Sequence, residues 1–454
     1  MGKTYRGLSR IGSTVEFKPK SDELTGKFYV KVFDYDGTQL GKTVWLNNGD
    51  TYKLEIEPPT HDRLVFANWC CTQDIVDNTV IIENQNVLIG ATYNTVSGLN
   101  ELEIELTPDI APNIEVDGFV VSFNTTSTFN RYWDYGNDTT TSDKLQSHTY
   151  YSYGRYIIAF SGNPYFGSSG IFGQKSANPN WFLKEVRCSG LGNSQSWGLD
   201  NGALNYCYGL TTLSNGDVTY TNLGTIDSCH NLKCIIGKRN TYTRSYENFN
   251  LETLIIQKNA FTNYTTVGFY NIGSASSYPS LTNYVIPKGF TEVGGNEVFF
   301  SNNKNKIIRV PEQVTNLAGL TVNNVIEELY LPNNLKSVNN VQQLYQLKKI
   351  HNLENTKIST VGQFGYLCPK LEVLKFPATL TSITGQCFKN MIALKYVDLS
   401  RCLQVVTLSR GDVFLGVPPT AKVIVPDEFY KDYIIATNWV NEAFRIIKAS
   451  EVQL

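Results

Sequence analysis

Four histidines, His61, His148, His230 and His351, are the side chains best suited to acid–base chemistry near neutral pH, and they lie far apart in the chain. No H-E-x-x-H, G-x-S-x-G, Walker or dinucleotide-binding motif occurs in the sequence. A glycan hydrolase remains an alternative, because two facing carboxylates could come from any of the 41 acidic residues. We predict that the protein is not an enzyme and uses no cofactor and no metal ion.

Nine cysteines offer a second kind of chemistry. Two are adjacent, and the set contains no CxxC pair: Cys70, Cys71, Cys188, Cys207, Cys229, Cys234, Cys368, Cys387 and Cys402. An odd number without that spacing is typical of neither a disulfide framework nor a zinc site. The sequence therefore predicts reduced, mostly buried thiols in a reducing compartment.

The composition limits the classes of partner. The chain has 454 residues, which suggests two to four domains, and only 18% of them are charged, with a net charge of -2. This balance argues against nucleic-acid binding, which requires a basic surface. No apolar run is long enough to span a bilayer, and the first residues resemble neither a secretory signal nor a myristoylation motif, so we expect no membrane insertion.

A phrase such as "LEVLKFPATLTSI", residues 371–383, recurs along the second half of the chain. Short apolar strands end at Pro287, Pro311, Pro332, Leu353, Pro377, Ser400 and Pro426, at intervals of 24, 21, 21, 24, 23 and 26 residues. Weaker copies end at Ser189, Gly237 and Gln257. Each phrase can bury its apolar face only against its neighbours, so we predict a solenoid with a continuous core, in which Cys229, Cys368 and Cys387 are buried.

The direction of each side chain in these strands indicates which residues could bind a ligand. In each apolar-x-apolar strand the middle side chain points away from the core. The predicted outward ladder contains Val285, Arg309, Tyr330, His351, Lys375, Asp398 and Ile424. Of these we select Arg309, Tyr330, His351, Lys375 and Asp398 as ligand-binding candidates, with Trp181 and Trp197 as aromatic contacts for carbohydrate. A solvated sheet face without a ligand is the alternative.

The repeat resembles the BspA-type leucine-rich repeats of bacterial surface proteins and of phage or protist adhesins. The resemblance rests on "PATLTSITGQCFKNMIALKYVDLS", residues 377–400, and covers roughly residues 180 to 450. The ending "AKVIVPDEFYKDYIIATNWVNEAFRIIKAS" is similar to the terminal cap of that family. The first half of this repeat region departs from the family pattern, because its strands are irregularly spaced and separated by polar insertions.

Two further resemblances lie upstream. Residues 28–93 contain alternating strands, an Asp36-Gly37 turn, a Trp69 that we expect in the core, and a final "ATY". They resemble the Listeria–Bacteroides (internalin B-type) repeat, a β-grasp-like module. Residues 114–161, with "YWDYGNDTTTSD" and "HTYYSYGRYIIAF", resemble a PKD-type immunoglobulin-like domain.

These resemblances imply a mainly β rod. We predict an N-terminal docking arm (1–25), a β-grasp-like module (26–100), an immunoglobulin-like β-sandwich (101–162), and a leucine-rich-repeat solenoid with short helices and a terminal cap (163–454). We expect a non-catalytic phage virion appendage, such as a tail or head fibre, that is made in the host cytoplasm. The arm would contact other virion proteins, the solenoid would bind a bacterial surface receptor or gut glycan, and the chain would form a homo-oligomer. A bacterial cell-surface adhesin that binds host protein or glycan is the alternative.

Overall fold

The computed structural model describes most of the chain from residue 27 onward. The described residues are 27–123, 133–134, 136, 140–141, 147–160, 171–172, 178–188, 204–214, 228–237, 250–257, 266–267, 282–285, 288, 292–293, 306–318 and 320–452. The predicted arm at 1–25 and Trp197 lie outside them. No helix among these residues is long and apolar enough to cross a membrane.

Six strands form the N-terminal module: β1 (Lys27–Phe33), β2 (Gln39–Asn47), β3 (Thr51–Lys53), β4 (Leu64–Cys71), β5 (Thr79–Ile81) and β6 (Val87–Thr95). A mixed sheet has the order β2-β1-β6-β4, in which β1 and β6 run parallel. The predicted turn at Asp36-Gly37 joins β1 to β2. One face of this sheet covers the module's own core, which includes Trp69 as predicted.

The next segment contains β7 (Asn100–Leu106), α1 (Ile114–Asp117), β8 (Phe119–Ser122), β9 (Trp133–Asp134), β10 (Thr140–Thr141), β11 (Ser147–Tyr150) and β12 (Gly154–Phe160). Strand β7 pairs antiparallel with both β12 and β13, the first solenoid strand, so this segment and the solenoid share one sheet. Strands β8 and β11 pair antiparallel and form a separate two-stranded sheet. The segment therefore caps the start of the solenoid.

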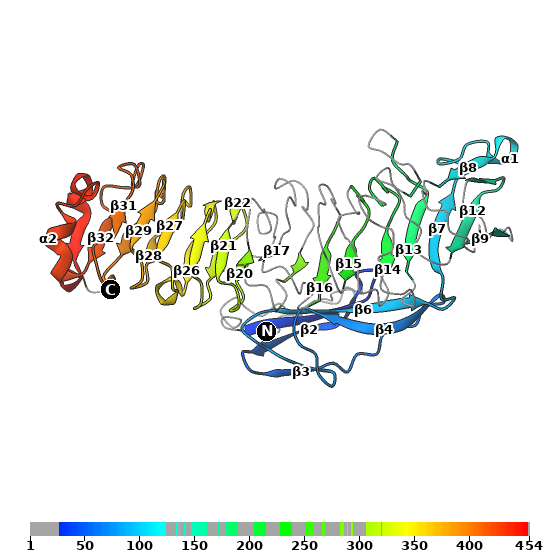
Figure 1. Cartoon of the computed structure of the whole chain (residues 1–454), viewed down its shortest axis with the longest axis horizontal. Coiled ribbons are helices and arrows are strands. Elements are labelled where there is room, and N and C mark those ends of the chain that lie inside the picture. The colour runs from blue at the N-terminus through cyan, green and yellow to red at the C-terminus, as the bar shows by residue number, and fades with distance from the viewer. Residues whose placement is uncertain are drawn as a thin grey trace, which may run out of the picture.

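A β-solenoid spans residues 185–448 (Figure 1). Its first ladder of parallel strands consists of β13 (Leu183–Arg187), β14 (Thr212–Ser214), β15 (Cys234–Gly237), β16 (Thr253–Ile256), β18 (Asn283–Tyr284), β20 (Ile307–Arg309), β23 (Glu328–Tyr330), β26 (Lys349–His351), β28 (Val373–Lys375), β30 (Tyr396–Asp398), β32 (Lys422–Val425) and β33 (Ile446–Lys448). We call the side of this ladder that points away from the core the ladder face.

A second ladder runs along another side of the solenoid. It consists of β17 (Thr266–Val267), β19 (Glu292–Val293), β21 (Asn316–Ala318), β24 (Ser337–Asn339), β27 (Thr360–Gly362), β29 (Ser382–Thr384) and β31 (Thr407–Leu408). A short third pair is formed by β22 (Thr321–Asn323) and β25 (Gln342–Leu344). The coils that begin with β16, β18, β20, β23, β26, β28 and β30 therefore each contribute a strand to both ladders, as expected for a solenoid.

The repeated residues explain the coil. Leucines and valines of successive coils fill one continuous core from Leu102 to Ile446, and Cys229, Cys368 and Cys387 lie in it fully buried, as predicted. Threonines of the "TLTSI" phrase connect coils, because the Thr379 hydroxyl donates to Ile358 O at 2.8 Å and that of Thr381 donates to Ser359 O at 3.0 Å. The phrase thus supplies both the core and the bonds between neighbours.

The far end is closed by short helices: η4 (Asp427–Phe429), α2 (Tyr430–Tyr433), η5 (Trp439–Arg445) and η6 (Ala449–Glu451). One further short helix, η3 (Leu353–Asn355), lies within the solenoid after β26. Trp439 and Tyr433 are fully buried here. The indole nitrogen of Trp439 donates to Val406 O at 2.6 Å, and Tyr433 Oη accepts from Val406 N at 3.0 Å. The backbone N–H and C=O of Val406 thus receive partners from the cap, in place of the partners that another coil would supply.

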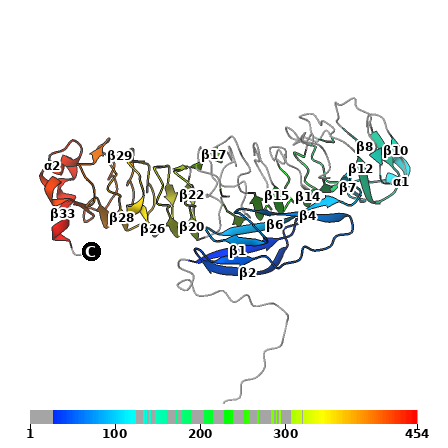
Figure 2. The ribbon, with the colours of Figure 1, turned by 60° about the horizontal axis from the view of Figure 1, so that its bottom comes forward.

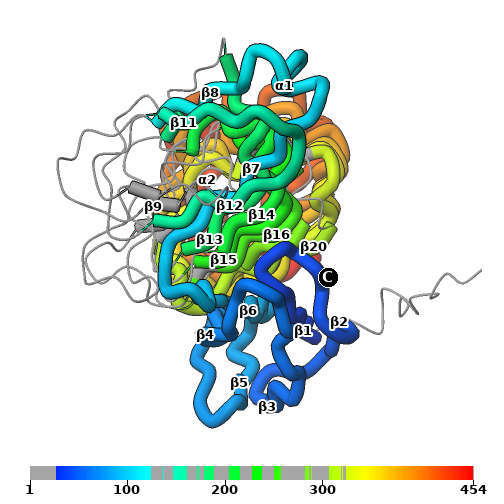
Figure 3. Tube along the Cα trace, turned by 90° about the vertical axis from the view of Figure 1, so that its right-hand side faces the viewer, coloured from blue at the N-terminus to red at the C-terminus, as the bar shows by residue number. Residues whose placement is uncertain are grey.

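The N-terminal module does not continue the rod. It lies lengthwise along the ladder face, beneath β14 to β20 (Figures 1 and 2), and the end view in Figure 3 shows it against one side of the solenoid. The prediction of a linear arrangement of modules is therefore wrong. The sequence-level reason is that one face of the module's sheet and the ladder face opposite it are both apolar, so each buries the other.

Candidate functional site

The N-terminal module buries the first part of the ladder face, which we call the covered half (β13 to β18). Its contact cluster joins module residues with outward residues of the solenoid: Tyr29, Phe33, Cys70, Leu88, Cys234, Ile236, Ile255 and Val285. Two glycines permit the close approach. A Cβ at Gly37, which has φ +93°, would lie 2.9 Å from Cys234 Cβ, and one at Gly90 would lie 2.6 Å from Ile236 Cδ1.

Polar bonds fix the register of the covered half. Lys31 Nζ donates to Asn283 Oδ1 at 2.9 Å, and Ser214 Oγ donates to Tyr93 O at 3.0 Å. Lys288 donates its backbone N–H to Thr72 O at 2.7 Å, and its ammonium group contacts the carboxylates of Asp74 and Glu83 at 2.8 Å. The bonds are distributed along the module, so the contact is specific over its length.

A buried ion cluster lies at the start of this contact. The guanidinium of Arg187, whose side chain is 7% exposed, contacts carboxylates of Glu101 at 3.5 Å, Glu185 at 2.6 Å and Glu103. Arg63 of the module forms a bidentate pair with Glu101 at 2.8 Å. Burial raises the pKa of Glu185, an effect that Arg187 opposes. These carboxylates are held by arginines, so the cluster is structural in character and does not resemble the open acid–base pair of a glycoside hydrolase.

Beyond the module lies the open half of the ladder face (β20 to β30). Here Arg309, Tyr330 and His351 form one stack along three neighbouring strands. The guanidinium carbon of Arg309 lies 3.9 Å from the Tyr330 ring centroid. The ring centroids of Tyr330 and His351 are 3.9 Å apart, and the two ring planes form an angle of 4°. Because β23 lies between β20 and β26, these neighbours occupy the two faces of the Tyr330 ring.

Glu328 holds the stack together. Its Oε2 is 2.8 Å from His351 Nε2 and accepts from the Tyr330 hydroxyl at 3.2 Å. Burial lowers the pKa of Arg309, while Tyr330 and Glu328 act in the opposite direction. Arg309 also lies 5.2 Å from the Phe28 ring, so the stack begins at the edge of the module.

The other predicted ladder residues have different environments. Lys375 is exposed on β28, as predicted. Asp398 is only 9% exposed, and its Oδ1 accepts from Ser400 N at 2.9 Å, so it stabilises the turn after β30. Val285 is 8% exposed under the module, and Ile424 is 1% exposed in β32 beside the last strand. All three are buried, so they do not extend the solvent-exposed surface of the open half.

An alternating charge ladder flanks the open half. Lys306 and Lys348 lie 2.7 and 2.6 Å from the two carboxylate oxygens of Glu327, and Lys395 lies 2.7 Å from Glu372. The hydrogen bonds from Lys306 and Lys348 lower the pKa of Glu327 to about 2. Each of these side chains lies just before a strand of the first ladder. Stacking of the coils therefore places each charge beside an opposite charge on a neighbouring coil.

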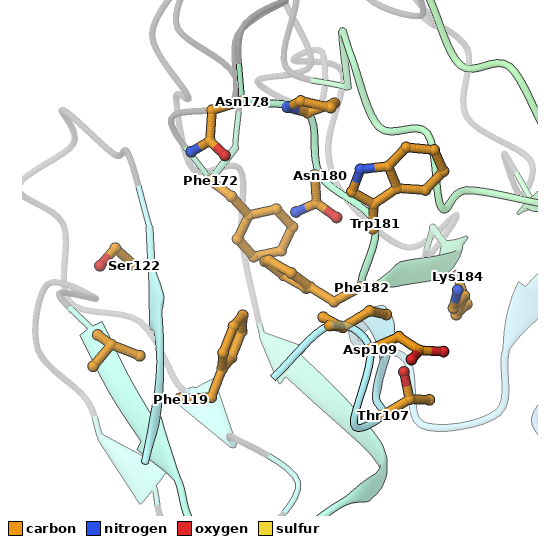
Figure 4. Close-up of a pocket in the computed structure, with 13 residues that line it drawn as sticks. Thr107, Asp109, Phe119, Ser122, Phe172, Asn178, Asn180, Trp181, Phe182 and Lys184 are labelled. Atoms are coloured by element: carbon orange, nitrogen blue, oxygen red, sulfur yellow. The ribbon is translucent and has the colours of Figure 1, made fainter. Parts of the chain in front are cut away.

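A pocket of about 790 Å³ lies where the β8 segment meets the first coil (Figure 4). Phe119, Phe172, Trp181 and Phe182 contribute rings to its lining. Trp181 is 51% exposed and makes an edge contact with Tyr208 at 5.1 Å. The sequence selected Trp181 but missed the phenylalanines, because they come from segments that looked like two different modules.

The cysteines have no visible role in a site. All nine are buried as thiols. Burial raises the pKa of Cys368, Cys387 and Cys402 to about 12, far above the range in which a thiolate forms. Among the described residues, no group of three or more His, Cys, Asp or Glu is arranged to hold a metal ion.

Comparison with known families identifies one region. Residues 294–409 match the BspA type leucine rich repeat region in six copies. This part of the chain is a BspA-type leucine-rich-repeat region that forms part of the β-solenoid, and such repeats are typical of binding or adhesion proteins and usually non-catalytic. No curated protein matches the sequence. The resemblances of 26–100 and 101–162 to other modules remain predictions.

Proposed function

We propose that this chain is a non-catalytic adhesion protein that binds its receptor through the open half of the ladder face. The observation that carries the proposal is the Arg309–Tyr330–His351 stack, which is ordered by Glu328 and lies on the part of the face that the module leaves uncovered. Repeat solenoids bind partners through extended faces of this kind. A pre-ordered stack also reduces the conformational entropy lost on binding.

The stack favours a receptor recognised through hydrogen bonds and charge. Both faces of the Tyr330 ring are already occupied, so a sugar ring has no face to stack on there. The groups that remain are the edges of the stack and the ammonium groups of Lys349 and Lys375, which are exposed. A protein or an acidic polysaccharide of the bacterial surface fits these groups.

We further propose that the chain is a phage virion appendage of the fibre or decoration type, with the arm at residues 1–25 bound to other virion proteins and with the chain in a homo-oligomer. Nine buried thiols support folding in a reducing cytoplasm, where virion proteins are made. Full-length protein on beads should retain virion proteins from a phage lysate and lose them when residues 1–25 are removed. Retention of host protein or glycan instead would favour a bacterial surface adhesin.

Binding of the full-length protein to intact gut bacteria tests the proposed receptor surface. The double variant Lys349→Glu, Lys375→Glu reverses two exposed charges on the open half, and we expect it to lose most of the binding. The control variant Lys42→Glu, Lys431→Glu makes the same charge change at exposed positions in the module and in the terminal cap. Equal binding by the two variants would place the receptor site elsewhere.

A further inference from the structure

We propose that the pocket at the capped start of the solenoid binds a neutral saccharide. It is a second site, separate from the open half of the ladder face, and the adhesion function proposed above does not use it. Its volume of about 790 Å³ lies within the range of roughly 300–1,000 Å³ that is usual for small-ligand sites.

The rings of the pocket suit the apolar side of a sugar. Trp181 is 51% exposed, so its indole is accessible at the rim. Phe119 and Phe182 contact each other edge to face at 5.6 Å, and Phe172 contacts Phe182 at 5.0 Å, which holds the wall in place. A sugar buries its C–H surface against such rings while its hydroxyls face outward.

A buried amide supplies a donor without a partner. The side chain of Asn180 lines the pocket, and the residue is 3% exposed. Its Oδ1 accepts from Leu183 N at 2.9 Å, which fixes the orientation of the amide. Its Nδ2 is buried and has no hydrogen-bond partner in the part of the chain that the structure describes.

An unpaired buried N–H is unfavourable, and a ligand hydroxyl or carbonyl oxygen would remove that cost. Nδ2 has almost no exposed surface in this conformation, so a ligand oxygen bonds to it when a neighbouring wall side chain moves aside. Figure 4 shows Asn180 between Asn178 and the ring of Phe182, with Trp181 beside it.

The charges of the rim favour a neutral, hydroxyl-rich ligand. Asp109 and Lys184 lie on the same side of the pocket (Figure 4). A carboxylate accepts from hydroxyl groups and an ammonium donates to them, so a sugar can use both. Because the two charges are opposite and the Lys184 ammonium also lies 3.9 Å from Glu105, neither an anion nor a cation gains a net Coulomb attraction at this rim.

Saturation-transfer NMR on the full-length protein tests this inference. The probes are the methyl glycosides of glucose, galactose, mannose, fucose and N-acetylglucosamine at millimolar concentration. We expect at least one of them to bind, and Trp181→Ala to weaken that binding about tenfold through the lost ring contact. Asn180→Asp keeps the acceptor for Leu183 N but removes the donor, and we expect a loss of similar size.

Two controls separate a binding effect from a folding effect. Phe444→Ala removes an aromatic side chain that is 56% exposed at the opposite end of the solenoid and should leave binding unchanged. Thermal melting of each variant identifies any that is unfolded, and Asp109→Asn replaces Asn180→Asp if that variant does not fold. The inference is wrong if no glycoside binds, if the pocket variants bind as well as the wild type, or if phenol or indole binds in a Trp181-dependent manner and the glycosides do not.

Failure of this test leaves the proposed adhesion function standing. The variant Lys349→Glu, Lys375→Glu should bind glycosides normally while it loses adhesion to cells. Trp181→Ala should show the reverse. If both variants lost both activities, the two surfaces would form one site, and the proposal of a separate saccharide pocket would be wrong.

Discussion

The covered and open halves of the ladder face are built from the same repeat but carry different outward side chains. In the covered half the outward positions include Cys234, Ile236 and Ile255, each no more than 3% exposed. In the open half the corresponding positions hold Arg309, Tyr330 and His351. The core behind both halves is the same continuous cluster. The contrast shows that the inward residues determine the solenoid, whereas the outward residues determine what contacts it.

The largest effect is expected from breaking the ion cluster of the covered half. Replacing Arg187 with Ala leaves Glu101, Glu103 and Glu185 without their central cation, and we expect a loss of about 3–5 kcal/mol in the free energy of unfolding, measured by denaturant titration. The matched control is Arg155→Ala. Its side chain is 66% exposed and pairs with Glu103 and Glu105, so its loss should stay below about 1 kcal/mol.

The loss caused by Arg187→Ala should also depend on pH. Burial raises the pKa of Glu185, so the folded state holds this proton at a pH where the unfolded state has released it. Stability from such a group is present below the unfolded pKa and falls as the pH rises through the folded pKa. The variant should therefore lose less stability near about pH 4 than near about pH 7. A loss that grew on acidification would contradict this account of the cluster.

A charge placed in the apolar contact should release the module. Ile255 is fully buried there, and we expect Ile255→Asp to cost about 2–3 kcal/mol and to expose β1 and β6 to amide hydrogen exchange. Ile307→Asp is the control, because Ile307 is 37% exposed on β20 and its replacement should leave exchange unchanged. Unchanged exchange in both variants would mean that apolar burial does not hold the module.

Truncation of the stack tests the open half. Tyr330→Ala removes the ring between Arg309 and His351 and should cost only about 1 kcal/mol, because the side chain is half-buried and makes no core contact. A thermal melt of the full-length protein measures this. A loss as large as that of Arg187→Ala would show that the open half is packed as a structural contact and would count against its proposed role as a binding surface.

The smallest effect is expected in the charge ladder. Glu327→Gln should cost about 0.5 kcal/mol at neutral pH, since Lys306 and Lys348 are largely exposed. The pKa of Glu327 is lowered to about 2, so its contribution is present above its ordinary pKa and disappears as the pH falls toward 2. Denaturation at low and high salt should show the difference between variant and wild type shrinking in salt. A salt-independent difference would contradict an electrostatic origin.

The repeats were the part of the fold that the sequence predicted well. Proline at the strand end, leucine in the core and threonine between coils all act within one coil and its neighbour, so they are visible as a period. The outward direction of Arg309, Tyr330 and His351 followed from strand alternation alone. Their mutual stacking was not predicted, because it depends on side-chain rotamers.

Contacts between distant segments could not be predicted in this way. Gly90 and Ile236 meet across the module contact, although they are far apart in the sequence and neither has a distinctive spacing. The pocket likewise combines Phe119 with Trp181 and Asn180, and the unpaired amide of Asn180 is defined only by what surrounds it. Such features depend on tertiary packing, which one sequence does not encode as a local pattern.

The position of the module limits where this solenoid can change length. A coil inserted between β26 and β28 would add one more row of side chains to the open half and would leave every module contact in place. A coil inserted between β14 and β18 would shift Ser214 away from Tyr93 or Lys288 away from Thr72. Both bonds join the solenoid to the same module sheet, so the number of coils between them must match the length of that sheet. Repeat number is therefore free to vary in the open half and fixed beside the module, so related chains should differ in size mainly between β20 and β30.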